Sequence, residues 1–131
     1  MHMITEDEPS YHARALYRRL SARPWRVLYV GLDVALLDYL KARLEECWIV
    51  RAPAGCVARP FIEHLRYSVL VFDEVLMDMT AREVAGWTRE LAGREGRAVV
   101  VFRKWDEFEM VAGSIEGLVA AGRGERRAAL M

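Results

Sequence analysis

The sequence lacks an excess of charge of either sign, a long apolar run and a cysteine-rich segment. Its 131 residues include 19 basic and 19 acidic side chains, so the chain as a whole offers no electrostatic basis for binding nucleic acid. No apolar run approaches the roughly 18 residues that a membrane span requires. The two cysteines, Cys47 and Cys56, lack metal-ligand spacing and indicate reduced thiols in a cytoplasmic protein. Neither a membrane nor a nucleic acid is therefore an expected partner.

The motifs of common enzyme classes are missing as well. Gly31 stands alone, without the glycine spacing of a dinucleotide-binding turn. His12 and His64 are isolated on helical segments, and no serine lies in a nucleophile motif. We therefore expect a protein that is not an enzyme, and the length favours a single domain with its own core.

Segments typical of strands and of helices alternate along the chain. Four apolar or β-branched runs predict strands, and a helical pattern follows each of them: Trp25–Val30, Trp48–Val50, Val69–Phe72 and Ala98–Phe102. This alternation predicts an α/β fold, with an open parallel sheet, helices on both of its faces and right-handed crossovers.

Local signals predict where the helices begin. Asp33 can cap the first helix after the first strand, and Pro60 suits the first turn of the next. Thr80 with Glu83 forms a capping-box pattern, and Asp106 with Glu109 forms another.

Flanking segments complete the expected organisation. Residues 1–24 form an N-terminal extension whose Ser10–Ala22 segment has the apolar spacing of an amphipathic helix, which Pro24 ends. Residues 25–122 form the domain, and 123–131 a weakly helical or frayed tail.

Asp73 is the leading candidate site residue. It follows the uncharged run Val69–Phe72, and the carboxyl ends of strands are where open α/β sheets hold their sites. A charge inside the strand would cost several kcal/mol, so the carboxylate is expected at the strand mouth. The residues alone leave two interpretations open, a site carboxylate and a plain strand terminator.

Residues 25–122 resemble the receiver domain of bacterial two-component response regulators. The resemblance rests on a first strand, a first helix, a turn and a phosphoacceptor strand with its loop, at Val27–Val30, Ala35–Glu45, Ala52–Gly55 and Leu70–Met79 respectively. It implies a flavodoxin-like (CheY-like) fold, in which Asp73 would accept a phosphoryl group from a histidine kinase.

The chain departs from the family where the resemblance would place Mg²⁺. Two adjacent acids follow the family's first strand, whereas here Gly31 and Leu32 occupy those places and only Asp33 is acidic. Mg²⁺ needs near-octahedral oxygen ligands. Asp73 with the backbone carbonyl near Val75 gives at most two of these ligands, and Asp33, the other candidate, suits a helix cap better. No metal or other cofactor is therefore expected. Glu74 could add a carboxylate or be a solvated loop acid.

Basic residues follow the fourth strand where the family has a serine or threonine. Arg103 or Lys104 could pair with Asp73 and mimic a switched state, or both could be exposed at a helix entry.

The fifth strand and fifth helix of the family have no counterpart in the sequence. The Ala98–Phe102 strand would then be an uncharged edge that invites pairing. The sheet face beside the first receiver helix would also lose cover, and we expect the Ser10–Ala22 helix to replace the missing helix, either in its own chain or in a partner subunit. A homodimer built on the edge strand or the last helix is a second expectation.

These features favour a degenerate, truncated receiver-like signalling module that works by protein–protein contact or dimerisation. The alternative is a functional phosphoacceptor that takes a phosphoryl group on Asp73 with Mg²⁺ and a histidine kinase. A third interpretation, an unrelated α/β ligand-binding module, would place a pocket at the strand mouths with Asp73 against Arg103 or Lys104.

Overall fold

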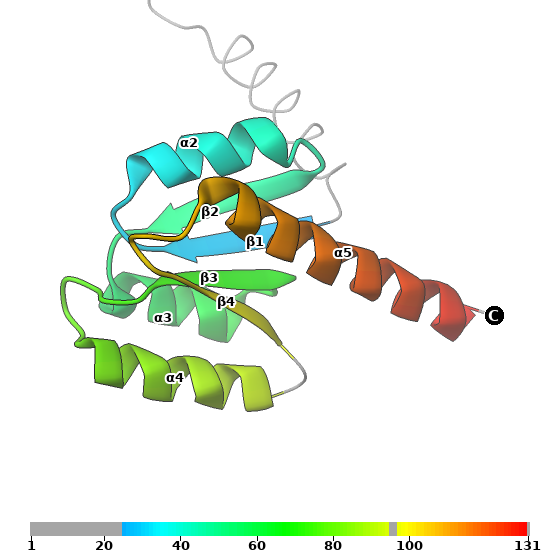
Figure 1. The fold of residues 1–131 in the computed structure, drawn as a ribbon. Helices are drawn as coiled ribbons and strands as arrows, with labels where there is room; N and C mark the ends of the chain where they lie inside the picture. Colours follow the sequence, from blue (N-terminus) through cyan, green and yellow to red (C-terminus); the bar gives the residue numbers. More distant parts are fainter. Residues whose placement is uncertain (1–24, 95–96, 131) are drawn as a thin grey trace, which may run out of the picture.

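The structure, a computed structural model, describes residues 25–94 and 97–130, with side chains described as far as Gly122 (Figure 1). The predicted N-terminal helix Ser10–Ala22 lies outside the described residues.

Four parallel strands form the single sheet of the described chain. They are β1 (Trp25–Val30), β2 (Cys47–Ala52), β3 (Val69–Asp73) and β4 (Ala98–Phe102). Their order across the sheet is β2-β1-β3-β4, and every neighbouring pair is parallel. The expected α/β, flavodoxin-like fold is confirmed, and its two central strands, β1 and β3, end side by side at the carboxyl edge.

Within the described residues, four helices cover the sheet, two on each face (Figure 1). Helices α2 (Val34–Arg43) and α5 (Phe108–Leu130) lie on one face, and α3 (Gly55–His64) and α4 (Ala81–Gly93) lie on the other. Among the described residues, none of these helices is both long and apolar enough to cross a membrane.

Successive side chains of β1 point to opposite faces of the sheet and so contribute to two separate cores. Val27 and Tyr29 point into the core beneath α2 and α5, whereas Leu28 and Val30 point into the core beneath α3 and α4. All four side chains are fully buried. Full burial of an aliphatic side chain contributes about 1.5–3 kcal/mol, so the strand stabilises both layers at once.

Helix α5 corrects one expectation. The face beside α2 is not short of cover, because α5 packs there through its buried side chains Val111, Ala112, Ile115 and Val119. The expectation that this face loses its cover was therefore wrong. The Ser10–Ala22 helix lies outside the described residues, so its packing stays a prediction. Helix α5 also runs past residue 122, where the domain was expected to end, and extends beyond the sheet to Leu130 (Figure 1).

The helix starts agree with the local signals in two of four cases. Asp33 Oδ1 accepts a hydrogen bond from the Leu36 N–H at 3.0 Å, and Thr80 with Glu83 forms the complete capping box. Pro60 was misplaced, since α3 begins at Gly55 and the proline lies inside it. The Asp106 prediction was also wrong, because its carboxylate accepts from the Arg103 N–H at 2.8 Å and α5 begins at Phe108.

Candidate functional site

Asp73 is the last residue of β3, at the carboxyl edge of the sheet. The four residues before it in β3 are buried, and Asp73 itself is half-buried. Its side chain therefore lies at the boundary between the core and the solvent, as the sequence predicts.

Neutral groups of the first strand and its loop hold the Asp73 carboxylate. The Tyr29 hydroxyl donates to Asp73 Oδ1 at 2.5 Å, and the Leu32 N–H donates to Asp73 Oδ2 at 3.0 Å. The Tyr29 hydroxyl also accepts from the Asp33 N–H at 3.0 Å. These bonds tie the β1–α2 loop to the end of β3, so Asp73 fixes the loop in which the family carries its metal ligands.

Gly31 provides the space that the carboxylate occupies. A Cβ at residue 31 would lie 2.3 Å from Asp73 Cγ, which no real structure tolerates. The glycine backbone is itself fixed, because its N–H donates to the Ala52 carbonyl at 2.9 Å and its carbonyl accepts from Arg51 at 3.2 Å. A side chain at residue 31 would require the Asp73 carboxylate to leave the position that it occupies here.

Burial sets the proton affinities of this pair. Burial raises the pKa of Asp73, hydrogen bonds from Tyr29 and Leu32 lower it in part, and the nearby Asp33 charge raises it further. Burial and the bond to Asp73 also raise the pKa of Tyr29, so the tyrosine remains a neutral donor.

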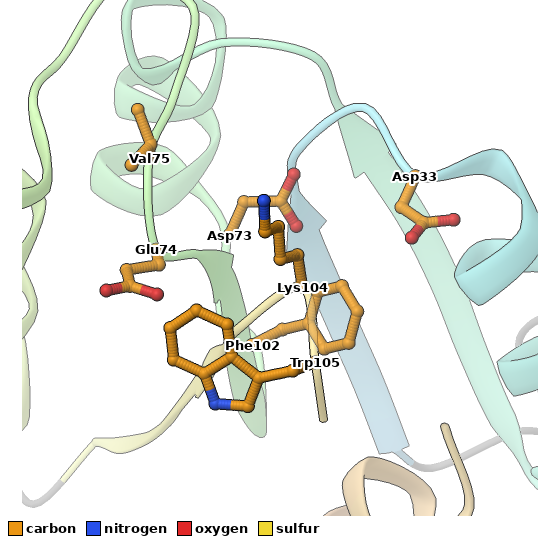
Figure 2. Close-up of a pocket in the computed structure, with 7 residues that line it drawn as sticks. All are labelled: Asp33, Asp73, Glu74, Val75, Phe102, Lys104 and Trp105. Atoms are coloured by element: carbon orange, nitrogen blue, oxygen red, sulfur yellow. The ribbon is translucent and has the colours of Figure 1, made fainter. Parts of the chain in front are cut away.

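A cavity of about 420 Å³ opens above Asp73 (Figure 2). It is formed by the β1–α2 loop, the end of β3 and the connection from β4 to α5, through Asp33, Asp73, Glu74, Val75, Phe102, Lys104 and Trp105. The predicted residues Asp33, Glu74 and Lys104 thus meet at Asp73, whereas Arg103 does not line the cavity.

Cations do not neutralise Asp73 in the described part of the chain. No ion pair there joins Asp73 to Arg103 or Lys104; its hydrogen bonds come from Tyr29 and Leu32. The third interpretation, an unrelated ligand-binding module, required a pocket with Asp73 against one of these cations. The pocket is present, and the pairing is not.

The residues at this edge do not fit a magnesium site. Mg²⁺ demands near-octahedral oxygen ligands at short distances. Both oxygens of Asp73 already accept hydrogen bonds, and Asp33 Oδ1 caps α2. Within residues 25–94 and 97–122, no three His, Cys, Asp or Glu side chains are placed to hold a metal ion.

Sequence reasoning missed three residues of this edge. Tyr29 had a usable signal, because it is the one polar-tipped side chain in an otherwise aliphatic stretch before Gly31. Asp78 accepts from the Gly55 and Cys56 N–H groups, each at 2.8 Å, and these bonds lower its pKa. Trp105 is 67% exposed beside the cavity, and nothing in its sequence context distinguishes it.

Exposed apolar side chains occur in the loops that follow β1, β3 and β4. We call four of them, each more than half exposed, the apolar rim: Leu32, Val75, Met77 and Trp105. Of these, Val75 and Trp105 line the cavity. Exposed apolar groups gathered at one edge are typical of surfaces that contact other molecules.

Comparison with solved structures relates this geometry to known proteins. The signal receiver domain of a protein named as a Luxo repressor from Vibrio parahaemolyticus matches with a TM-score of 0.61 and 17% identity, over 79% of this chain and 95% of that one. A CheY-like response regulator receiver domain from Methanospirillum hungatei matches with a TM-score of 0.58 and 19% identity, over 77% and 98%.

The response regulator PhyR from Brucella abortus matches with a TM-score of 0.61 and 13% identity, over 95% of this chain and 60% of that one. No protein-family model matches the chain, and no curated protein matches it significantly by sequence. The fold is that of a response regulator receiver domain.

Within the receiver fold, Asp73 lies where the resemblance places the phosphoacceptor, at the end of β3. The surroundings differ from that expectation at Gly31 and Leu32, which supply space and a backbone donor instead of carboxylates.

Proposed function

We propose that this chain is a receiver-like signalling module that acts through protein–protein contact, without Mg²⁺-dependent phosphorylation of Asp73. One observation carries the proposal: the Asp73 carboxylate packs against Gly31 and is hydrogen-bonded there by Tyr29 and Leu32. In this role Asp73 is a structural tie between β1 and β3, not a reactive group.

The chemistry of phosphoryl transfer supports this assignment. Catalysis of such transfer consists of positioning and of neutralising charge on the phosphoryl oxygens, much of it by a metal ion. Here each Asp73 oxygen already accepts a protein hydrogen bond, and the neighbouring carboxylates belong to Asp33, a helix cap, and to Glu74. A phosphoryl group would add negative charge beside them, and Lys104 is the one cation of the described residues that lines the cavity.

The partners in this proposal are proteins. The apolar rim offers a contact surface for a histidine kinase or another signalling protein, and a second copy of the chain is a further partner. Neither nucleic acid nor membrane is included, the chain is not proposed as an enzyme, and its place of action is the cytoplasm.

The phosphoacceptor alternative has one specific observation in its favour. Asp73 is half-buried rather than sealed, and it opens onto the same cavity as Lys104. If Tyr29 and Leu32 released the carboxylate, it could be reached by a phosphodonor.

Beryllofluoride with Mg²⁺ distinguishes the two functions. The wild type and Asp73→Asn are each titrated while tryptophan fluorescence is recorded, since Trp105 lies in the wall of the cavity. We expect no saturable change in either protein. A phosphorylatable receiver domain, titrated in parallel, verifies the reagent.

A saturable, Mg²⁺-dependent change in the wild type that Asp73→Asn abolishes would establish the phosphoacceptor and overturn our proposal. Incubation with acetyl phosphate followed by intact-mass measurement provides a second readout. There we expect no phosphoryl adduct on the wild type.

A further inference from the structure

Strand β4 leaves one side of its backbone unpaired in the described chain. It is the last strand in the order β2-β1-β3-β4 and pairs with β3 alone. The Phe102 carbonyl accepts from the Glu74 N–H at 2.9 Å, so the backbone of Phe102 faces β3. Because successive residues of a strand face opposite ways, the N–H and C=O groups of Val99 and Val101 face outward.

The two edges of the sheet are protected unequally. The β4 sequence, Ala98–Phe102, contains no charge, no proline and no glycine, and Val101 is 38% exposed. At the opposite edge, β2 contains Arg51, whose guanidinium donates to the Gly31 carbonyl. Charged residues are one of the usual means by which proteins keep an edge strand from pairing, and β4 has none.

Among the described residues, no fifth strand pairs with β4. Residues 1–24 have the apolar spacing of a helix over Ser10–Ala22, with prolines at residues 9 and 24. The chain that follows β4 continues directly into α5.

We infer that the β4 edge binds a second copy of this chain, antiparallel, about a two-fold axis. This inference rests on the proposed function, in which the module acts through protein contact, and it names the partner. A two-fold contact between two β4 strands occupies the free β4 edge of both subunits, so the assembly closes as a dimer. A β4 edge left unpaired would remain available to bind further copies.

The register follows from the outward-facing backbone groups. With the axis at Val100, Val99 lies opposite Val101 of the partner subunit. Each such pair exchanges both of its main-chain hydrogen bonds. The side chains of Val99 and Val101 project toward the α4 face, where Val99 already packs in the core, so pairing also buries the exposed Val101.

Sedimentation equilibrium of the full chain tests the dimer. We expect the wild type to be dimeric at micromolar concentration and Val101→Lys to weaken the dimer at least about tenfold, since pairing would bury an unpaired charge. Val34→Lys is the matched control, because Val34 is 54% exposed and lies on α2, away from the β4 edge. The dissociation constant of the dimer should be unchanged in this variant. Circular dichroism verifies that both variants fold.

Hydrogen exchange at the Val99 and Val101 amides locates the contact. In the dimer these amides should be protected, and dilution below the dissociation constant should remove the protection. A wild type that stays monomeric at about 200 μM overturns the inference. So does a dimer whose Val99 and Val101 amides exchange freely, which would place the interface elsewhere, or protected amides in a monomer, which would mean that the chain covers its own edge.

These measurements use neither Mg²⁺ nor a phosphodonor. A monomer that does not respond to beryllofluoride would overturn the dimer and leave the proposed function intact. A dimer that responds to beryllofluoride through Asp73 would overturn the proposed function and leave the dimer intact.

Discussion

Asp73 and Gly31 compete for one small space at the carboxyl end of β1. The carboxylate fills the volume that any side chain at residue 31 would need, with Asp73 Oδ2 at 2.3 Å and Oδ1 at 2.5 Å from the position of a Cβ. The two positions are thus coupled: either a side chain projects from residue 31 or Asp73 reaches Tyr29 and Leu32. Because residue 31 has no side chain, the Asp73 carboxylate can pack there and bind Tyr29 and Leu32.

Gly31→Ala should destabilise the protein by about 1–3 kcal/mol, because the new methyl group must displace the Asp73 carboxylate. Urea denaturation followed by circular dichroism measures the change. In an Asp73→Ala background the colliding atoms are gone, so the same Gly31→Ala substitution should cost much less. The difference between the two backgrounds is the coupling energy.

Gly86→Ala is the matched control for that cycle. Gly86 lies inside α4 with no heavy atom within 4 Å of an added Cβ, so alanine should stabilise by about 0.5–1 kcal/mol through helix propensity. Equal losses from Gly31→Ala in the two Asp73 backgrounds would show that the carboxylate is not what excludes a side chain at residue 31.

The raised pKa of Asp73 predicts a pH dependence with a definite sign. Its folded-state pKa lies above the ordinary value of 3.8, so the folded protein binds this proton more tightly than the unfolded chain does. The stability due to that proton is fully present below the ordinary value and is lost as the pH rises through the folded-state pKa. Relative to Asp73→Asn, the wild type should therefore lose stability as the pH rises from the ordinary value of 3.8 through the folded-state pKa. Urea midpoints of both proteins across this range test the sign; a constant difference would mean that the pKa is unshifted.

At the scale of elements, helix α3 is capped by a residue from a different part of the chain. Its own cap position, Ala54, makes no side-chain cap, and Asp78 in the β3–α4 connection accepts from the first two N–H groups instead. The helix dipole and these donors favour the charged carboxylate. The connection that follows Asp73 is thereby tied to α3, as the β1–α2 loop is tied to Asp73.

Asp78→Ala should lower the urea midpoint and fray the start of α3, because the Gly55 and Cys56 N–H groups lose their acceptors. Amide exchange at these two residues should accelerate more than at the rest of α3. Asp38→Ala, at an exposed position inside α2, changes the same charge without removing a cap and should have little effect. Equal effects of the two substitutions would argue against the cap.

The lowered pKa of Asp78 adds a pH test. The stability that the charged Asp78 carboxylate contributes is present above the ordinary pKa of 3.8 and is lost as the pH falls through the folded-state pKa.

The parts of this fold that the sequence predicts depend on residues close together in the chain, and the parts that it does not predict depend on residues far apart. The strands, the Asp33 cap and the Thr80–Glu83 capping box depend on neighbours a few residues apart, and the sequence was sufficient for them. The start of α3 depends on Asp78, and the restraint on Asp73 depends on Tyr29. Both contacts cross between elements. A local pattern can mark Tyr29 as unusual in its strand, but it cannot say which residue the hydroxyl meets. Pro60 misled for the same reason, since its preference for a first turn is weaker than a cap supplied from elsewhere.

At the scale of the whole molecule, β1 and β3 are common to both cores, so neither core can be lost alone. Val27, Tyr29, Val69 and Val71 face α2 and α5, while their neighbours in the same strands face α3 and α4. Damage to one layer should therefore unfold the protein as a unit, with coincident transitions by circular dichroism and tryptophan fluorescence.

Ile115→Ala tests whether α5 is the element that covers the α2 face. Ile115 is fully buried in that core, so its truncation should cost about 2–5 kcal/mol and lower the stability of the whole domain in a single transition. Met110→Ala lies on the same helix, but Met110 is 67% exposed, so its change should stay within about 0.5 kcal/mol. If Ile115→Ala were tolerated as well as Met110→Ala, another segment of the chain would have to cover this face. The Ser10–Ala22 helix would then be the first candidate for that cover.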